Sequence, residues 1–86
     1  MIDSEFDLHE ENIRTKEELY YFLDKIITEA YHKGDKNIRI ITGRGNNSKN
    51  RPLLKPVTDQ YLKSNKLVDH YRLDLSLGAF EIWLSN

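Results

Sequence analysis

The sequence predicts an α/β domain, a two-layer βαβαββ sandwich with a mixed four-stranded sheet. Two strand-like segments flank an amphipathic helix in the first half of the chain. A second amphipathic helix follows, and then two more strand-like segments separated by a glycine turn. The chain has 86 residues, too few for two independent cores. We therefore expect a single domain over 1–86, with a core of about 5–85.

Two short segments in the first half predict parallel strands. Residues 6–9 alternate apolar and polar side chains, as a half-buried strand does, so Asp7 and His9 should share one face. Residues 37–41 are short and rich in β-branched side chains. Because a helix connects these two segments, the crossover requires the strands to run parallel. Their carboxyl ends should then meet at one end of the sheet.

The segment between these strands predicts a long helix. Thr15 and Glu18 have the spacing of a capping box, in which the two side chains satisfy backbone N–H groups at the helix start. Gly34 is a natural C-terminal stop, and His32 just before it complements the helix dipole, which favours a structural role. The apolar stripe expected to face the core holds Leu19, Phe22, Leu23, Ile26 and Ala30.

The second half of the chain predicts a loop, a helix and two strands. The loop over 42–50 is rich in glycine, asparagine and serine. We expect Pro56 within the first turn of the next helix and Pro52 before it, because a proline inside a helix removes a hydrogen bond. Strands are expected over 68–75 and 79–84. The apolar side of the helix holds Leu54, Val57, Tyr61 and Leu62.

Charge is divided unevenly along the chain, although its net charge is −1. Residues 1–35 hold ten acidic and four basic side chains, whereas 36–72 hold nine basic and two acidic ones. A basic face that meets phosphates would explain the division, and ordinary solvated surface charge is the alternative. The absence of cysteine excludes disulfides and thiolate metal sites. No apolar stretch reaches the roughly 20 residues of a membrane span, so we expect a cytoplasmic protein without a signal peptide or a membrane partner.

Two motifs should meet where the parallel strands end. Asp7 and His9 end the first strand, and Thr42-Gly43-Arg44-Gly45 follows the second. His9 could act as an acid or base near neutral pH, while Asp7 could orient it, bind a metal ion or activate water. The two glycines allow backbone N–H groups to approach an anion, and Arg44 adds a guanidinium suited to phosphate. Taken alone, each motif is more often structural than functional.

Together, these motifs resemble the Smr (small MutS-related) family in order and spacing, over about residues 5–85. The resemblance rests on Asp7-Leu8-His9, residues 40–46, residues 54–57, Tyr61-Leu62 and Gly78-Ala79. It implies a fold like that of the C-terminal domain of bacterial translation initiation factor three. It also implies endonuclease or nicking activity on DNA or RNA. Three positions depart from the family pattern, where a leucine, a glycine and a histidine are usual: Phe6, Glu10 and Thr42.

The leading hypothesis is phosphodiester cleavage. The catalytic residues that it implies are Asp7, His9, Thr42 and Arg44. The residues expected to bind nucleic acid are Gly43, Arg44, Gly45, Lys49, Arg51 and Lys55. One alternative is a DNA- or RNA-binding module that uses the same basic loop without cleavage, and another is a domain that docks on a ribosome or protein partner. A divalent cation such as Mg²⁺, held partly by substrate phosphates, is compatible with one acid and one histidine.

Overall fold

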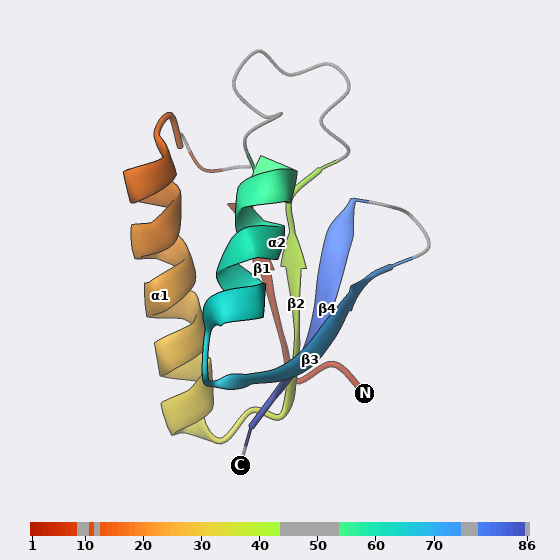
Figure 1. The fold of residues 1–86 in the computed structure, drawn as a ribbon. Coiled ribbons are helices and arrows are strands. Elements are labelled where there is room, and N and C mark those ends of the chain that lie inside the picture. Colours follow the sequence, from red (N-terminus) through yellow and green to blue (C-terminus); the bar gives the residue numbers. More distant parts are fainter. Residues whose placement is uncertain (9–10, 12, 44–53, 75–77, 86) are drawn as a thin grey trace.

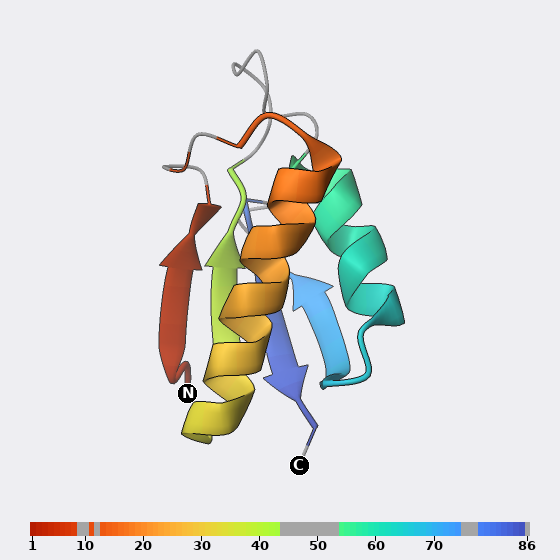
Figure 2. The same ribbon diagram turned by 90° about the vertical axis from the view of Figure 1, so that its left-hand side faces the viewer.

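The computed structural model describes residues 1–8, 11, 13–43, 54–74 and 78–85. The predicted βαβαββ order is confirmed, and the four strands form one mixed sheet in the order β1-β2-β4-β3. Both helices cover the same face of the sheet, which gives two layers (Figures 1 and 2). The elements are β1 (Ser4–Asp7), α1 (Lys16–Lys33), β2 (Asn37–Ile41), α2 (Leu54–Ser64), β3 (Val68–Leu73) and β4 (Ala79–Leu84).

The strand pairing follows from the connections. β1 and β2 run parallel, as the helical crossover predicts, and Asp7 lies opposite Ile41 at the end of both strands. β4 is antiparallel to β2 and to β3. Two strand ranges predicted from the sequence are corrected: the first strand ends at Asp7 and the third at Leu73. The first strand ends where the N–H of Glu11 donates to the carbonyl oxygen of Leu8, which is buried in the core.

The caps of α1 form as predicted. The N–H of Glu18 donates to the Thr15 hydroxyl at 3.1 Å, and the N–H of Thr15 donates back to the Glu18 carboxylate at 3.1 Å. Hydrogen bonds from the backbone N–H groups of Arg14 and Thr15 lower the pKa of Glu18. At the other end Gly34 adopts φ 94°, a left-handed conformation that favours glycine. None of the helices in the described ranges is long and apolar enough to cross a membrane.

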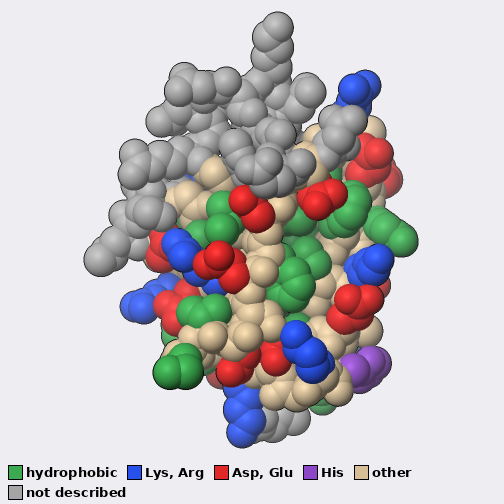
Figure 3. Space-filling view, turned by 180° about the vertical axis from the view of Figure 1, so that it is seen from behind, with side chains coloured by type: hydrophobic (Ala, Val, Ile, Leu, Met, Phe, Trp, Pro, Cys, Tyr) green, Lys and Arg blue, Asp and Glu red, His purple; other side chains and the backbone are tan. Residues whose placement is uncertain are grey.

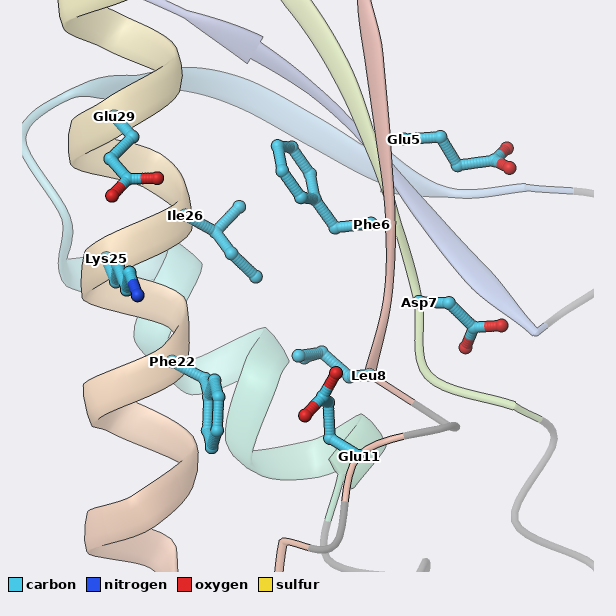
Figure 4. A pocket seen from close by; sticks show the side chains of 9 residues that line it. All are labelled: Glu5, Phe6, Asp7, Leu8, Glu11, Phe22, Lys25, Ile26 and Glu29. Carbon is cyan, nitrogen blue, oxygen red and sulfur yellow. The ribbon is translucent and has the colours of Figure 1, made fainter.

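The buried stripe of α1 differs from the predicted one. Its core-facing residues are Leu19, Leu23, Ile27 and Ala30. Ile27 was missed, whereas Phe22 and Ile26 are only partly buried. The reason is tertiary: α2 packs along one side of α1 while the sheet lies beneath it (Figure 2). The stripe is therefore centred between these two neighbours, and Phe22 and Ile26 face the β1 edge of the sheet (Figure 4).

Two tyrosines tie α2 to its neighbours through carboxylates. The Tyr61 hydroxyl donates to Asp24 of α1 at 3.1 Å, and the Tyr71 hydroxyl of β3 donates to Asp59 of α2 at 2.7 Å. Burial, followed by these bonds to carboxylates, raises the pKa of both tyrosines to about 12. Pro56 lies within the first turn of α2, as predicted. The second helix is thus held in place by polar contacts as well as by its apolar side.

The two faces of the sheet differ in chemistry. The helix-facing side chains of the central strands are apolar and fully buried: Ile38, Ile40, Phe80 and Ile82. On the opposite face, charged side chains stand in register across the four strands: Glu5, Arg39, Glu81 and Arg72. Such alternation is what one core-facing and one solvated face require. The solvated face is therefore the one on which polar chemistry is accessible.

Candidate functional site

Asp7 stands where β1 ends. Its side chain is exposed and points away from α1, on the sheet face opposite the two helices (Figure 4). The strand's alternation explains this orientation, because Phe6 points toward the helices and its neighbours Glu5 and Asp7 point the other way. The carboxylate is accessible and stands on a regular strand, which fixes its direction.

Leu8 anchors the motif that Asp7 begins. It is only 1% exposed and belongs to the main core cluster. Its carbonyl oxygen accepts a hydrogen bond from the N–H of Glu11 at 3.1 Å, which closes a tight turn directly after β1. The apolar residue between Asp7 and His9 therefore holds the chain at this end of the sheet. His9 and Glu10 themselves lie outside the described residues.

The chain turns sharply where β2 ends. The N–H groups of Thr42 and Gly43 both donate to the carbonyl oxygen of Gly78, each at 2.9 Å. Gly43 has φ 77°, a left-handed conformation that a side chain would strain. Thr42 is buried, and its hydroxyl donates to the Gly43 carbonyl oxygen at 3.3 Å. The N–H of Gly43 is thus already engaged, and what this glycine supplies is the turn itself.

The predicted site residues fall into two groups. The structure brings Asp7 and the Thr42-Gly43 turn to the same end of the sheet, since Asp7 pairs with Ile41. Lys55 lies in the first turn of α2, which begins at this end of the molecule (Figure 1). Like His9, the remaining predicted residues lie outside the described ranges: Arg44, Gly45, Lys49 and Arg51.

Sequence reasoning missed a charge network beside Asp7 on the open face. Arg39 binds Asp74 at 2.7 Å and Glu5 at 3.0 Å. The hydrogen bond with Asp74 is the largest cause of the raised pKa of Arg39. The only early signal was the alternation of β1 and β2, which places Glu5 opposite Arg39. Because two carboxylates already neutralise Arg39, positive charge for a phosphate has to come from elsewhere.

An exposed histidine of β3 does not join this site. His70 of β3 stacks on Trp83 of β4, with ring centroids 4.4 Å apart, and its Nδ1 lies 2.7 Å from Asp69. Trp83 lies opposite Asn37, where β2 begins, so this cluster occupies the opposite end of the sheet from Asp7. Within the described ranges, no three histidine or carboxylate side chains gather as metal ligands.

Comparisons with known proteins agree with this architecture. The profile of the Smr domain family matches residues 6–76. The structure of YdaL, a stand-alone small MutS-related protein from Escherichia coli, aligns with a TM-score of 0.79 at 22% identity. That alignment covers 95% of this chain and 64% of YdaL, so the chain spans just under two thirds of YdaL's length.

A second structure gives a similar result. The Smr domain of Thermus thermophilus MutS2 aligns with a TM-score of 0.80 at 21% identity, and the alignment covers 96% of this chain and 99% of that domain. At such low identities the structural likeness shows the fold. No curated protein matches the chain in sequence.

Proposed function

The chain belongs to the Smr domain family, and from that premise we propose that it cleaves phosphodiester bonds in DNA or RNA, as an endonuclease or nickase. One observation carries the proposal: the exposed Asp7 carboxylate and the Thr42-Gly43 turn lie at the adjacent carboxyl ends of two parallel strands. In open α/β sheets, functional groups collect beyond these ends. Here the Thr42-Gly43 turn also leads into the most basic part of the sequence.

Each residue has a role in this proposal. His9 transfers a proton near neutral pH, and Asp7 orients it or contributes to a cation site. Arg44 binds the phosphate through its planar donors. Thr42 acts as a positioning residue, because its buried hydroxyl contacts the Gly43 carbonyl. The donor set fits Mg²⁺, which keeps several waters and uses one or two carboxylates plus substrate phosphates.

Affinity for the nucleic acid backbone is assigned to the segment after β2. Arg44, Lys49, Arg51 and Lys55 provide four cations, and Lys55 is half-buried at the start of α2. Basic side chains that neutralise phosphates release counterions, so such binding depends steeply on salt. Gly45 adds backbone freedom within the same segment. This division assigns binding to the basic segment and chemistry to the end of β1.

A binding module without cleavage is the second candidate, and one contact favours it. The N–H of Gly43 donates to Gly78, so this amide is not directed at a phosphate that becomes more negative during cleavage. Such a module would use the same basic segment to hold DNA or RNA. It would differ only in lacking the chemical step.

A cleavage assay separates the two candidates. Labelled single-stranded, double-stranded and branched DNA and RNA are incubated with the parent protein, Asp7→Asn and His9→Ala, with and without Mg²⁺. Asp69→Asn is a matched control, because Asp69 is an exposed aspartate beside a histidine at the far edge of the sheet. We expect cleavage by the parent and the control and its loss in the other two. Cleavage by the Asp7→Asn/His9→Ala double variant would contradict the proposal, whereas binding without cleavage by the parent would support the module.

A further inference from the structure

β1 is an edge strand. It pairs with β2 on one side, and no other strand in the described ranges lies along its outer side (Figure 2). An edge strand is a template on which another extended chain can form main-chain hydrogen bonds. The opposite edge of the sheet is β3. The β1 edge has a pocket beside it.

Beside β1 the surface is hollowed. A pocket of about 500 Å³ lies between β1 and α1, and its apolar part consists of Phe6, Leu8, Phe22 and Ile26. Figure 4 shows these side chains converging from the strand and the helix. Phe22 and Ile26 remain partly exposed because the buried stripe of α1 is centred toward α2. The fold therefore leaves apolar side chains uncovered directly beside the edge strand.

The rim of this pocket is acidic. Glu11, Glu29 and Lys25 stand on its helix side, while Glu5 and Asp7 contribute to its lining from β1 and extend their carboxylates onto the opposite face of the strand. Figure 3 shows this side of the molecule, with apolar side chains exposed between carboxylates. Glu29 stands toward one end of the pocket and Glu11 toward the other (Figure 4). An occupant should therefore be apolar where it enters the pocket and positively charged around it.

We propose that an extended segment of a protein partner, with alternating apolar and basic side chains, pairs with the outer edge of β1. Successive side chains of a strand point to opposite faces, so every second one enters the pocket beside Phe6. The others lie on the open face beside Glu5 and Asp7. Main-chain bonds supply affinity and the alternating side chains supply specificity, as in other cases of strand addition.

Charge selects this occupant over two others. A second copy of the chain paired through the same edge would place Glu5 and Asp7 beside carboxylates of its own kind, which is repulsive. A nucleic acid backbone running along this edge would bring phosphates beside Glu11 and Glu29 at the pocket. A basic strand meets neither obstacle. The interaction requires no cleavage activity, so it is independent of the proposed function.

The test is a titration of ¹⁵N-labelled protein with a short synthetic peptide that alternates lysine with valine. We expect amide shifts confined to β1 and to the side of α1 that carries Phe22 and Ile26. Two altered peptides probe the mechanism: one replaces lysine by glutamate, and the other is N-methylated at alternate positions to remove main-chain donors. Both should lose binding. Shifts on α2 or β3 instead, or equal binding of either altered peptide, would overturn the proposal.

Variants on the protein side sharpen the test. Glu29→Lys reverses one exposed rim charge and should weaken peptide binding about three- to tenfold. Asp69→Lys makes the same change on the opposite edge strand and should leave binding unchanged. Equal weakening by both variants would mean that only net charge matters and would contradict the proposal. Single-stranded RNA that shifts the amides of Phe22 and Ile26 and displaces the peptide would also overturn it, since the pocket would then bind nucleic acid.

Discussion

The two ends of the parallel β1–β2 pair are built differently. At the starting end the Asp3 carboxylate accepts hydrogen bonds from the N–H groups of Lys36 and Asn37, at 2.8 and 3.1 Å. The Asn37 side chain donates to the Ile82 carbonyl, which ties the same end to β4. At the carboxyl end Asp7 is exposed, and a left-handed glycine turns the chain into the basic segment. At the starting end, which we call the closed end, backbone N–H groups bind the aspartate carboxylate, whereas at the carboxyl end an exposed aspartate stands beside the Thr42-Gly43 turn.

We expect the closed end to contribute to stability and the carboxyl end to contribute to function. The backbone donors of Lys36 and Asn37 lower the pKa of Asp3, so the carboxylate of the closed end is used within the fold. Asp7 stands at the other end of the strand pair and extends onto the open face. We therefore propose a structural task for Asp3 and a functional one for Asp7. Removing each carboxylate in turn tests the comparison.

The largest expected effect is on cleavage. Asp7→Asn should reduce single-turnover cleavage about 100-fold or more, because the proposed role of the carboxylate is to orient His9 or to contribute to a cation site. It should change the free energy of unfolding by less than about 0.5 kcal/mol, as for most exposed positions. Asp3→Asn should do the reverse, with cleavage retained and stability reduced. Equal changes in the cleavage rate and in the free energy of unfolding for both substitutions would contradict this difference between the two aspartates.

Two substitutions in α1 test which of its side chains are buried in the core. Leu23→Ala should lower the free energy of unfolding by about 2–5 kcal/mol, because Leu23 is fully buried among the core residues. Ile26→Ala should cost less, under about 1.5 kcal/mol, because Ile26 is partly exposed at the pocket beside β1. Chemical denaturation measures both. Equal losses of unfolding free energy would mean that Ile26 is buried in the core, as the sequence predicted.

Nucleic acid affinity should depend on cations at the carboxyl end. Replacing Arg44, Lys49, Arg51 and Lys55 by alanine should weaken binding, and the slope of log affinity against log salt should fall by about one unit for each phosphate that is no longer neutralised. Fluorescence anisotropy at several salt concentrations measures the slope. A matched variant removes Lys33 and Lys36 near the closed end. A parental slope in the first variant and a reduced slope in the second would place binding at the closed end and contradict the comparison.

The smallest effect concerns pH. Asp3 and Glu18 have folded-state pKa values below their ordinary values of 3.8 and 4.5, because backbone N–H groups bind their charged forms. A lowered pKa stabilises the fold above the ordinary value, and that contribution is lost as pH falls through the folded value. Stability measured by urea unfolding should therefore be steady above about pH 5 and decline below it. Asp3→Asn should reduce this acid dependence.

The sequence predicted the parts of the fold that local patterns determine. The capping box at Thr15, the stop at Gly34 and the parallel pairing of β1 with β2 follow from short motifs and the crossover rule. The phase of α1 was wrong at Ile26 and Ile27, because a single helix does not reveal on which side α2 packs. The Asp3 contacts were not foreseen, because they join segments far apart in the sequence.

The candidate site was predictable in outline. The crossover rule places the end of β1 beside the end of β2, and the structure brings Asp7 beside Ile41 as expected. The hydrogen bond from the Gly43 N–H to Gly78 was not predictable, because it depends on β4 pairing beside β2. The same is true of the pocket beside β1, which exists because α1 turns Phe22 and Ile26 toward that edge. The roles of His9 and Arg44 remain predictions from the sequence.

If the proposed function is right, nucleic acid is bound and cut where β1 and β2 end. The most direct measurement is a map of backbone amide shifts in the ¹⁵N-labelled protein on binding a phosphorothioate oligonucleotide, which resists cleavage. We expect shifts at Asp7, at His9 and from Thr42 to Lys55, with little change at Asp3 and Asn37. Shifts concentrated at Asp3, Lys36 and Asn37, with Asp7 and Thr42 unaffected, would contradict the claim.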